Sequence, residues 1–162
     1  MGLAAEARGL SAGRIVFLVA ALVTFAADRM SKNAVVAALP EGAERPAIDH
    51  FLFIQHLQNS CAAFSICGGL GSPAFLAISI VVSCGIVYYA LKPPPQTVPV
   101  SLLLGMVLGG TLGNGFDRLL HGSVTDFLAV HWFPTFNLAD ASISVAIVLL
   151  ALGYGLRRQP DA

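Results

Sequence analysis

Long apolar segments separated by short polar ones dominate the chain. Four of them, at residues 15–39, 72–91, 98–116 and 136–156, are long enough for helices that span about 30 Å of hydrocarbon. Four spans bring both termini to the same side of a membrane. The pattern therefore predicts a single membrane-embedded domain over residues 1–162.

The first apolar segment follows a short polar start with two arginines, which is also the pattern of a secretory signal peptide. Apolar character resumes after the charges of DRMSK as NAVVAAL, however, and no clean small-residue cleavage site is present. We therefore expect one continuous helix. Asp28 and Lys32 share one face of it, either as an ion pair whose lysine snorkels to the interface or as part of a functional site.

Residues 40–71 form the longest segment outside the predicted spans. A charged, turn-like PEGAERP is followed by FLFIQHLQN, which has the aromatic and branched residues of a strand. We expect a small extramembrane β element here. Next to it, Asn59 begins NSCAAFS, whose small residues suit close backbone approach to an extended ligand, although a loop asparagine is also a common turn residue.

Composition places the chain among membrane proteins. Of its 162 residues, 56% are hydrophobic and 11% are charged, and a water-soluble core of this size cannot bury so much apolar surface. Nine basic residues balance nine acidic ones, so no nucleic-acid partner is indicated. The three cysteines lack metal-type spacing: Cys84 is a small side chain within an apolar segment, and Cys61 and Cys67 share a loop where an oxidising compartment would let them pair.

The nine Lys and Arg residues divide almost equally between the two sides of the predicted spans. Arg29, Lys32 and Arg118 fall inside polar motifs, where function rather than topology can hold them, and the 40–71 loop also carries acidic residues. Because cytoplasmic segments are enriched in Lys and Arg, we expect cytoplasmic termini and a polar cluster that faces outward.

The densest polar cluster is GNGFDRLLHGSVTDFLAVHWFPTFNLAD, which begins at Gly113. Charge inside a bilayer costs roughly 2.5 to 3.5 kcal/mol per Asp or Arg at a helix centre, and such charge is usually functional. Asn137 and Asp140 also suit a simpler role, as the cap of the fourth helix and an acid favourably placed at its positive end.

Aspartates from three spans and one loop fall at the same membrane depth if the four-helix topology holds: Asp28, Asp117, Asp126 and Asp140. Two neighbouring carboxyl groups do not both ionise readily, so one holds a proton while the other accepts one, and such a pair can activate water for attack on an amide. The sequence has no HExxH or GxSxG motif. Spacing alone does not say which two aspartates pair, and a small proton-coupled transporter is an alternative because it also uses intramembrane acids.

Four motifs in order, DRMSK, NSCAAFS, GNGFDRLLHGSVTDF and FNLAD, resemble those of lipoprotein signal peptidase, the signal peptidase II family of bacterial membrane aspartic peptidases. The resemblance implies an all-α membrane protein: four transmembrane helices with a small extracytoplasmic β-sheet and a short amphipathic helix. It implies that Asp126 and Asp140 are catalytic, that Asp117 is structural, and that no metal or organic cofactor is needed. Six further motif residues are implied to support the site or bind substrate: Asp28, Lys32, Asn59, Asn114, Arg118 and Asn137.

The implied reaction removes the signal peptide from a diacylglyceryl-modified prolipoprotein, just before the lipid-carrying cysteine, at the outer face of the bacterial inner membrane. Prolipoprotein and membrane lipid are then the partners, and a self-contained site leads us to expect a monomer. Two positions depart from the family pattern, since Cys61 stands where glycine is usual and Arg29 where an uncharged residue is commoner. Cysteine has a steric cost at a positive φ, so an inert relative that only binds lipoprotein is a further alternative.

Overall fold

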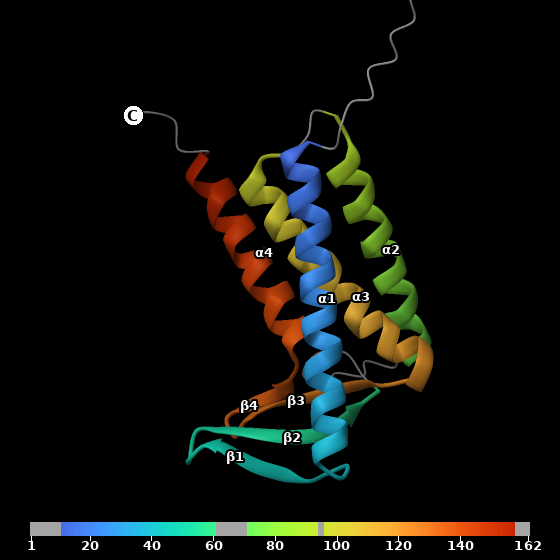
Figure 1. The fold of residues 1–162 in the computed structure, drawn as a ribbon, viewed down its shortest axis with the longest axis vertical. Helices are drawn as coiled ribbons and strands as arrows, with labels where there is room; N and C mark the ends of the chain where they lie inside the picture. The colour runs from blue at the N-terminus through green and yellow to red at the C-terminus, as the bar shows by residue number, and fades with distance from the viewer. Residues whose placement is uncertain (1–10, 61–70, 94–95, 158–162) are drawn as a thin grey trace, which may run out of the picture.

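Four helices run side by side, and a small sheet lies across one end of the bundle (Figure 1). The computed structural model describes residues 11–60, 71–93 and 96–157. The elements in chain order are α1 (Ala12–Ala38), β1 (Glu44–Ile48), β2 (Leu52–Asn59), α2 (Ser72–Leu91), α3 (Val98–His121), β3 (Val124–Val130), β4 (Phe133–Phe136) and α4 (Leu138–Arg157). Helix α1 begins, and α4 ends, at the end of the bundle away from the sheet.

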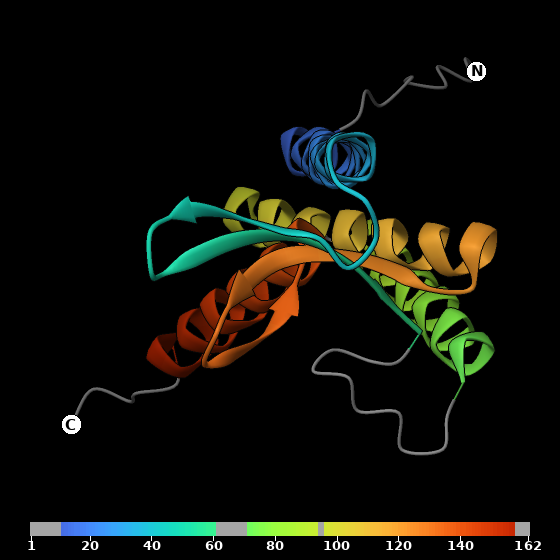
Figure 2. The same ribbon diagram turned by 90° about the horizontal axis from the view of Figure 1, so that it is seen from below.

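Helix α3 is the centre of the bundle. It packs against α1, α2 and α4, and the view from the sheet end shows α1 on one side of α3 with α2 and α4 on the other (Figure 2). Two glycines allow α1 to approach closely. A Cβ at Gly105 would lie 2.5 Å from the carbonyl oxygen of Phe17, and one at Gly109 would lie 2.4 Å from that of Ala21. Small residues at such contacts are typical of helix packing in membranes.

Gly109→Ala is expected to destabilise the bundle. The added methyl group would also lie 3.0 Å from the amide nitrogen of Phe25, so it faces backbone atoms that cannot move unless the helices separate. Overpacking of this kind costs about 1–3 kcal/mol and should lower the midpoint of thermal unfolding in detergent. Gly85→Ala is the matched control, because nothing lies within 4 Å of its Cβ position and alanine is the better helix former. Equal losses in the two variants would contradict a close-approach role for Gly109.

The sheet is antiparallel throughout, in the order β1-β2-β3-β4. The strand predicted from FLFIQHLQN is confirmed as β2. The prediction that Asp126 lies in a loop is wrong, because Asp126 is part of β3 and pairs with Leu57 of β2. Every residue of β3 except Leu128 is buried, so VTDFLAV lacks the alternation of apolar and polar residues by which a half-exposed strand is recognised.

The helix boundaries follow the apolar segments except at one end. Helix α3 continues beyond residue 116 through Asp117 and Arg118, and it ends where Gly122 takes a left-handed φ of 70°. Among the described helices, α2 and α3 are long and apolar enough to cross a membrane, and α4 holds a shorter apolar stretch. Large apolar side chains such as Leu22 and Val81 are exposed on the outside of the bundle, which fits a membrane setting. The loop after β2, with Cys61 and Cys67 and the amphipathic helix expected there, lies outside the described residues.

Candidate active site

Asp140 and Asn137 form a reciprocal cap at the start of α4. The backbone N–H of Asp140 donates to Oδ1 of Asn137 over 3.0 Å, and the backbone N–H of Asn137 donates to Oδ2 of Asp140 over 3.3 Å. This is the geometry of a capping box, so the capping role predicted from the sequence is present. The cap does not account for all contacts of the two side chains, because each also contacts a residue outside α4.

The second contact of Asn137 is to Asp126. The Nδ2 amide of Asn137 donates to Oδ1 of Asp126 over 2.7 Å, and Nδ2 of Asn59 donates to the other carboxyl oxygen over 2.8 Å. Asn137 is fully buried, at 0% exposure, and Asp126 is 3% exposed. One asparagine therefore joins the carboxyl groups of Asp126 and Asp140, which the sequence keeps apart on β3 and α4.

The environment of Asp126 makes its carboxyl group a weaker acid than usual. Burial raises the pKa of Asp126 from its ordinary 3.8 to about 6, and the nearby charge of Asp140 adds to the rise. The amides of Asn59 and Asn137 and the charge of Lys32 oppose the rise in pKa because they stabilise the carboxylate. An acid with a pKa in this range can exchange a proton near neutral pH, as acid-base catalysis requires.

The second contact of Asp140 leads to Lys32 through Asn114. Nδ2 of Asn114 donates to Oδ1 of Asp140 over 2.7 Å, and Oδ1 of Asn114 accepts from Nζ of Lys32 over 2.8 Å. An ammonium group has donors only, so Lys32 can face only the oxygen of this amide. The lysine therefore fixes the orientation of Asn114, which points an N–H at Asp140.

Asp28 holds Lys32 and the start of α4 together. Its Oδ2 lies 2.8 Å from Nζ of Lys32, and its Oδ1 accepts from the backbone N–H of Ala139 over 3.0 Å. A Cβ at Gly113 would lie 2.5 Å from this carboxyl group, so glycine is needed there. Asp28 and Lys32 are 0% and 1% exposed. The ion pair is therefore buried, and the snorkelling interpretation of Lys32 is wrong.

Asp117 forms ion pairs with both Lys32 and Arg29, which the sequence alone does not predict. Nζ of Lys32 lies 2.8 Å from its Oδ2, and Nη1 of Arg29 pairs with its Oδ1. Arg29 also lies over the ring of Phe116, with 5.1 Å from Cζ to the ring centroid. Two acids and two bases thus balance within one cluster, in which Arg29 is partly exposed and the other three side chains are buried. The one signal in the sequence for the pair of Arg29 and Asp117 is the unusual charge at residue 29. The two residues are 88 positions apart, so no spacing rule relates them.

Arg118 lies at the same end of α3 as Asp117, but its guanidinium group contacts a backbone oxygen and an aromatic ring. Its Nη1 donates to the backbone oxygen of Asn114 over 3.3 Å, and its Cζ lies 5.5 Å from the ring centroid of Phe75 on α2. It thereby links α2 to the turn of α3 that carries Asn114. An influence of its charge on the carboxyl pair stays a prediction.

The structure brings most of the predicted site residues into one network at the sheet end of the bundle. Its members are Asp28, Lys32, Asn59, Asn114, Asp117, Asp126, Asn137 and Asp140. Within the described ranges, no group of three or more His, Cys, Asp or Glu side chains is placed to hold a metal ion. The network combines a carboxyl pair with amides that donate to both acids, which suits acid-base attack by water.

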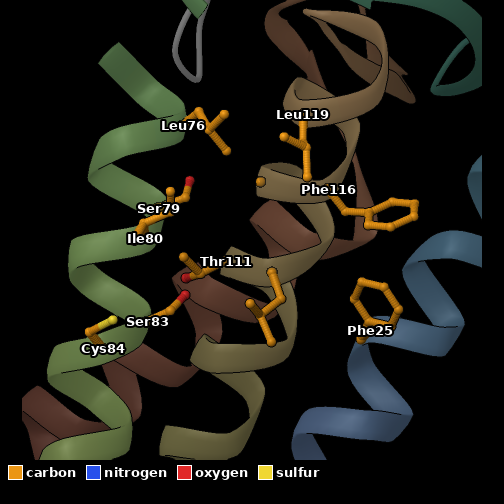
Figure 3. Close-up of a pocket in the computed structure, with 11 residues that line it drawn as sticks. Phe25, Leu76, Ser79, Ile80, Ser83, Cys84, Thr111, Phe116 and Leu119 are labelled. Atoms are coloured by element: carbon orange, nitrogen blue, oxygen red, sulfur yellow. The ribbon is translucent and has the colours of Figure 1, made fainter. Parts of the chain in front are cut away.

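Two cavities of the described structure differ in their lining. One, of about 470 Å³, is lined by Asp140 together with residues of β4 and α4. The other, of about 530 Å³, lies mainly between α2 and α3, where Ser79 and Ser83 of α2 point toward Thr111, while the ring of Phe116 points toward Phe25 of α1 (Figure 3). Its described lining has no charged side chain, whereas the first cavity reaches a carboxyl group of the network. Asp140 is therefore reached from the cavity beside α4.

Comparison with known proteins bears directly on this arrangement. The profile of the signal peptidase (SPase) II family matches residues 20–155. A lipoprotein signal peptidase of Gloeobacter violaceus is 41% identical over 142 residues, which cover 85% of this chain and 80% of that protein. One from Pseudomonas aeruginosa is 36% identical over 148 residues, with coverage of 86% and 88%.

The fold is also that of a bacterial membrane enzyme. A solved structure described as a bacterial membrane enzyme, determined by the in meso method at 2.3 Å resolution, aligns with a TM-score of 0.81 and 25% identity over 90% of this chain and 93% of that one. The chain belongs to the signal peptidase II family, which confirms the resemblance of the four motifs. Membership makes it a peptidase of lipoprotein processing and supports cleavage of signal peptides from prolipoproteins.

Proposed function

We propose that this chain is an aspartic endopeptidase that removes the signal peptide from diacylglyceryl-modified prolipoproteins, with Asp126 and Asp140 as its catalytic pair. The observation that carries the proposal is the position of Asn137. It is completely buried and contacts both carboxyl groups, one through its side-chain amide and one through its backbone. A structural cap of α4 requires only the contacts to Asp140. The hydrogen bond from Asn137 to Asp126 is not needed for the cap, and we assign it to positioning the carboxyl pair.

In the proposed mechanism, the two carboxyl groups hold one proton and one water between them. The ionised group takes a proton from the water as its oxygen attacks the scissile carbonyl carbon. The protonated group hydrogen-bonds the oxygen that gains negative charge, and it then protonates the leaving amine as the C–N bond breaks. Asn59, Asn114 and Asn137 keep the acids oriented through N–H groups that stabilise the ionised state.

We further propose that four helices cross the inner membrane, with cytoplasmic termini and with the sheet and the carboxyl pair at the periplasmic face. The network includes Asn59 of β2 and Asp126 of β3, so it lies at the sheet end of the bundle. Helix α1 begins and α4 ends at the other end (Figure 1). The lipid chains of the substrate would remain in the bilayer and enter sideways between helices. We also propose that the enzyme acts as a monomer, because a self-contained site needs only one chain.

The direct test is incubation of the purified protein with a diacylglyceryl-modified prolipoprotein. Mass spectrometry should find a free signal peptide and a product that begins with the lipid-carrying cysteine, whereas the unlipidated precursor should be cut poorly or not at all. Tight binding without cleavage would contradict the proposal and favour an inert relative.

We assign the shared proton to Asp140 and the role of base to Asp126. Cleavage should then fall as pH drops through about 6, because Asp126 takes up a second proton and the pair loses its base. Asn59→Ala removes an N–H that lowers the pKa of Asp126, so the acidic limb of the kcat profile should move to higher pH. Gln58→Ala is the matched control, since that side chain contacts Thr125 rather than Asp126. An unmoved acidic limb in Asn59→Ala would contradict this assignment.

The same raised pKa also affects stability. Between pH 3.8 and about 6 the folded protein retains a proton on Asp126 that the unfolded chain has lost. The contribution of this carboxyl group to stability is therefore greatest below that window and declines as pH rises through it.

A further inference from the structure

Trp132, Phe133 and Phe136 form a row of aromatic rings that runs from the turn of the β3–β4 hairpin along β4. The ring centroids of Trp132 and Phe133 are 6.0 Å apart, and those of Phe133 and Phe136 are 5.8 Å apart, with the latter rings nearly perpendicular. Trp132 is 76% exposed and Phe133 is 41% exposed. Exposure of this aromatic row to water is unfavourable. The residues around the row indicate what kind of surface covers it.

The aromatic row continues the apolar side of α4. Phe133 and Phe136 line the cavity of about 470 Å³ together with Ile143 and Val145 of that helix. Val145 is itself half exposed, as are large apolar side chains further along α4. With a rise of 1.5 Å per residue, Val145 lies only about 10 Å from the start of the helix. The row therefore meets the apolar side of α4 near the sheet end of that helix.

Polar groups of the same turn face the other way. The ring of His131 stacks on Phe53 of β2, with centroids 4.2 Å apart, and its Nε2 lies 3.5 Å from a carboxylate oxygen of Glu44 on β1. The hairpin thus places Phe133 and Phe136 toward α4 and the polar contact of His131 with Glu44 toward β1 and β2. Tryptophan is enriched where an apolar surface meets a polar one at a membrane interface, because its ring is apolar and its N–H needs a polar partner.

We propose that the aromatic row is a membrane anchor, seated between the headgroups and the upper acyl chains of the leaflet next to the sheet. Its partner is a lipid surface. The anchor would hold the hairpin, and with it the strand that carries Asp126, at a fixed depth. The cavity that reaches Asp140 would then open at the same boundary. This inference rests on the membrane location of the family and not on the chemistry of the carboxyl pair.

Trp132 is the only tryptophan in the chain, so its fluorescence tests the proposal directly. The full chain is reconstituted into phosphatidylcholine vesicles whose acyl chains carry bromine either near the glycerol or near the bilayer centre. We expect blue-shifted emission and a larger loss of intensity with the shallow bromine than with the deep one. Trp132→Phe supplies the background signal. Insensitivity to both lipids, together with quenching by aqueous iodide, would overturn the proposal, and so would equal or greater quenching by the deep bromine.

A second variant tests the role of the row as a unit. Phe133→Ser removes its middle ring and should weaken quenching by the shallow bromine, whereas Tyr154→Ser, an exposed aromatic at the other end of α4, should not. Equal effects of the two changes would overturn the role of the row. A protein without peptidase activity would still give the expected quenching, so failure here and failure of the proposed reaction are distinguishable.

Discussion

Cleavage of the lipidated substrate is expected to be lost in Asp140→Asn and in Asp126→Asn, with the helical bundle retained. An amide has nearly the volume of a carboxyl group but neither takes up nor supplies a proton under these conditions. A general acid or base contributes about 10²–10⁴-fold to rate. Because the same turnover needs one member as base and the other as acid, the loss of kcat in either variant should lie at the upper end of that range.

A modest loss of stability should accompany both changes. Each carboxyl oxygen of Asp126 accepts an amide N–H, and so does each oxygen of Asp140. The NH₂ of a substituted asparagine must then face another donor, which costs about 1–3 kcal/mol. Circular dichroism at the assay temperature separates this effect from the loss of chemistry.

The control for these variants is Asp49→Asn, the same chemical change at an exposed position in the turn between β1 and β2. It should retain both turnover and unfolding midpoint. Near-normal turnover in either Asp126→Asn or Asp140→Asn would remove that residue from the catalytic pair and require another aspartate of the network in its place.

The helices and β2 could be predicted because their sequences carry the signal locally. An uncharged apolar run identifies α2 whatever its neighbours are, and the aromatic and branched residues of FLFIQHLQN identify β2. Strand β3 carries no such signal. It is buried on both faces and holds a threonine and an aspartate, so VTDFLAV looks like an irregular segment until Asn59 and Asn137 are placed around it.

The site could be predicted as a set of residues but not as a set of contacts. Helical spacing relates Asp28 to Lys32, and Asn137 to Asp140. No spacing rule relates Lys32 to Asn114, which are 82 residues apart, or Asp28 to Ala139, which are 111 apart. These contacts depend on how α1 and α4 pack around α3. The positions of the aspartates in the sequence therefore predicted a carboxyl pair but not its members. The resemblance of the motifs to the family implied that the members are Asp126 and Asp140.

A double-mutant cycle on Lys32 and Asn114 should show strong non-additivity in kcat. If Lys32 acts on Asp140 only by fixing the amide of Asn114, its loss matters only while that amide is present. Misplacement of a catalytic group by about 1 Å can cost 10²-fold. We therefore expect Lys32→Met and Asn114→Ala each to lose about that factor, and the double variant to lose about the same factor rather than its square.

Stability should behave differently from rate in the same cycle. Lys32→Met leaves Asp28 and Asp117 without a shared cation, and breaking a buried ion pair costs about 3–5 kcal/mol, whether or not Asn114 is present. Arg29→Met is the matched control, because it removes the other cation from Asp117 without touching Asn114. It should lower the unfolding midpoint and largely retain kcat. Losses of kcat that multiply in the double variant, or an equal loss in Arg29→Met, would reduce Lys32 to a structural ion pair. The predicted outcome would instead make it the residue that aims Asn114 at Asp140.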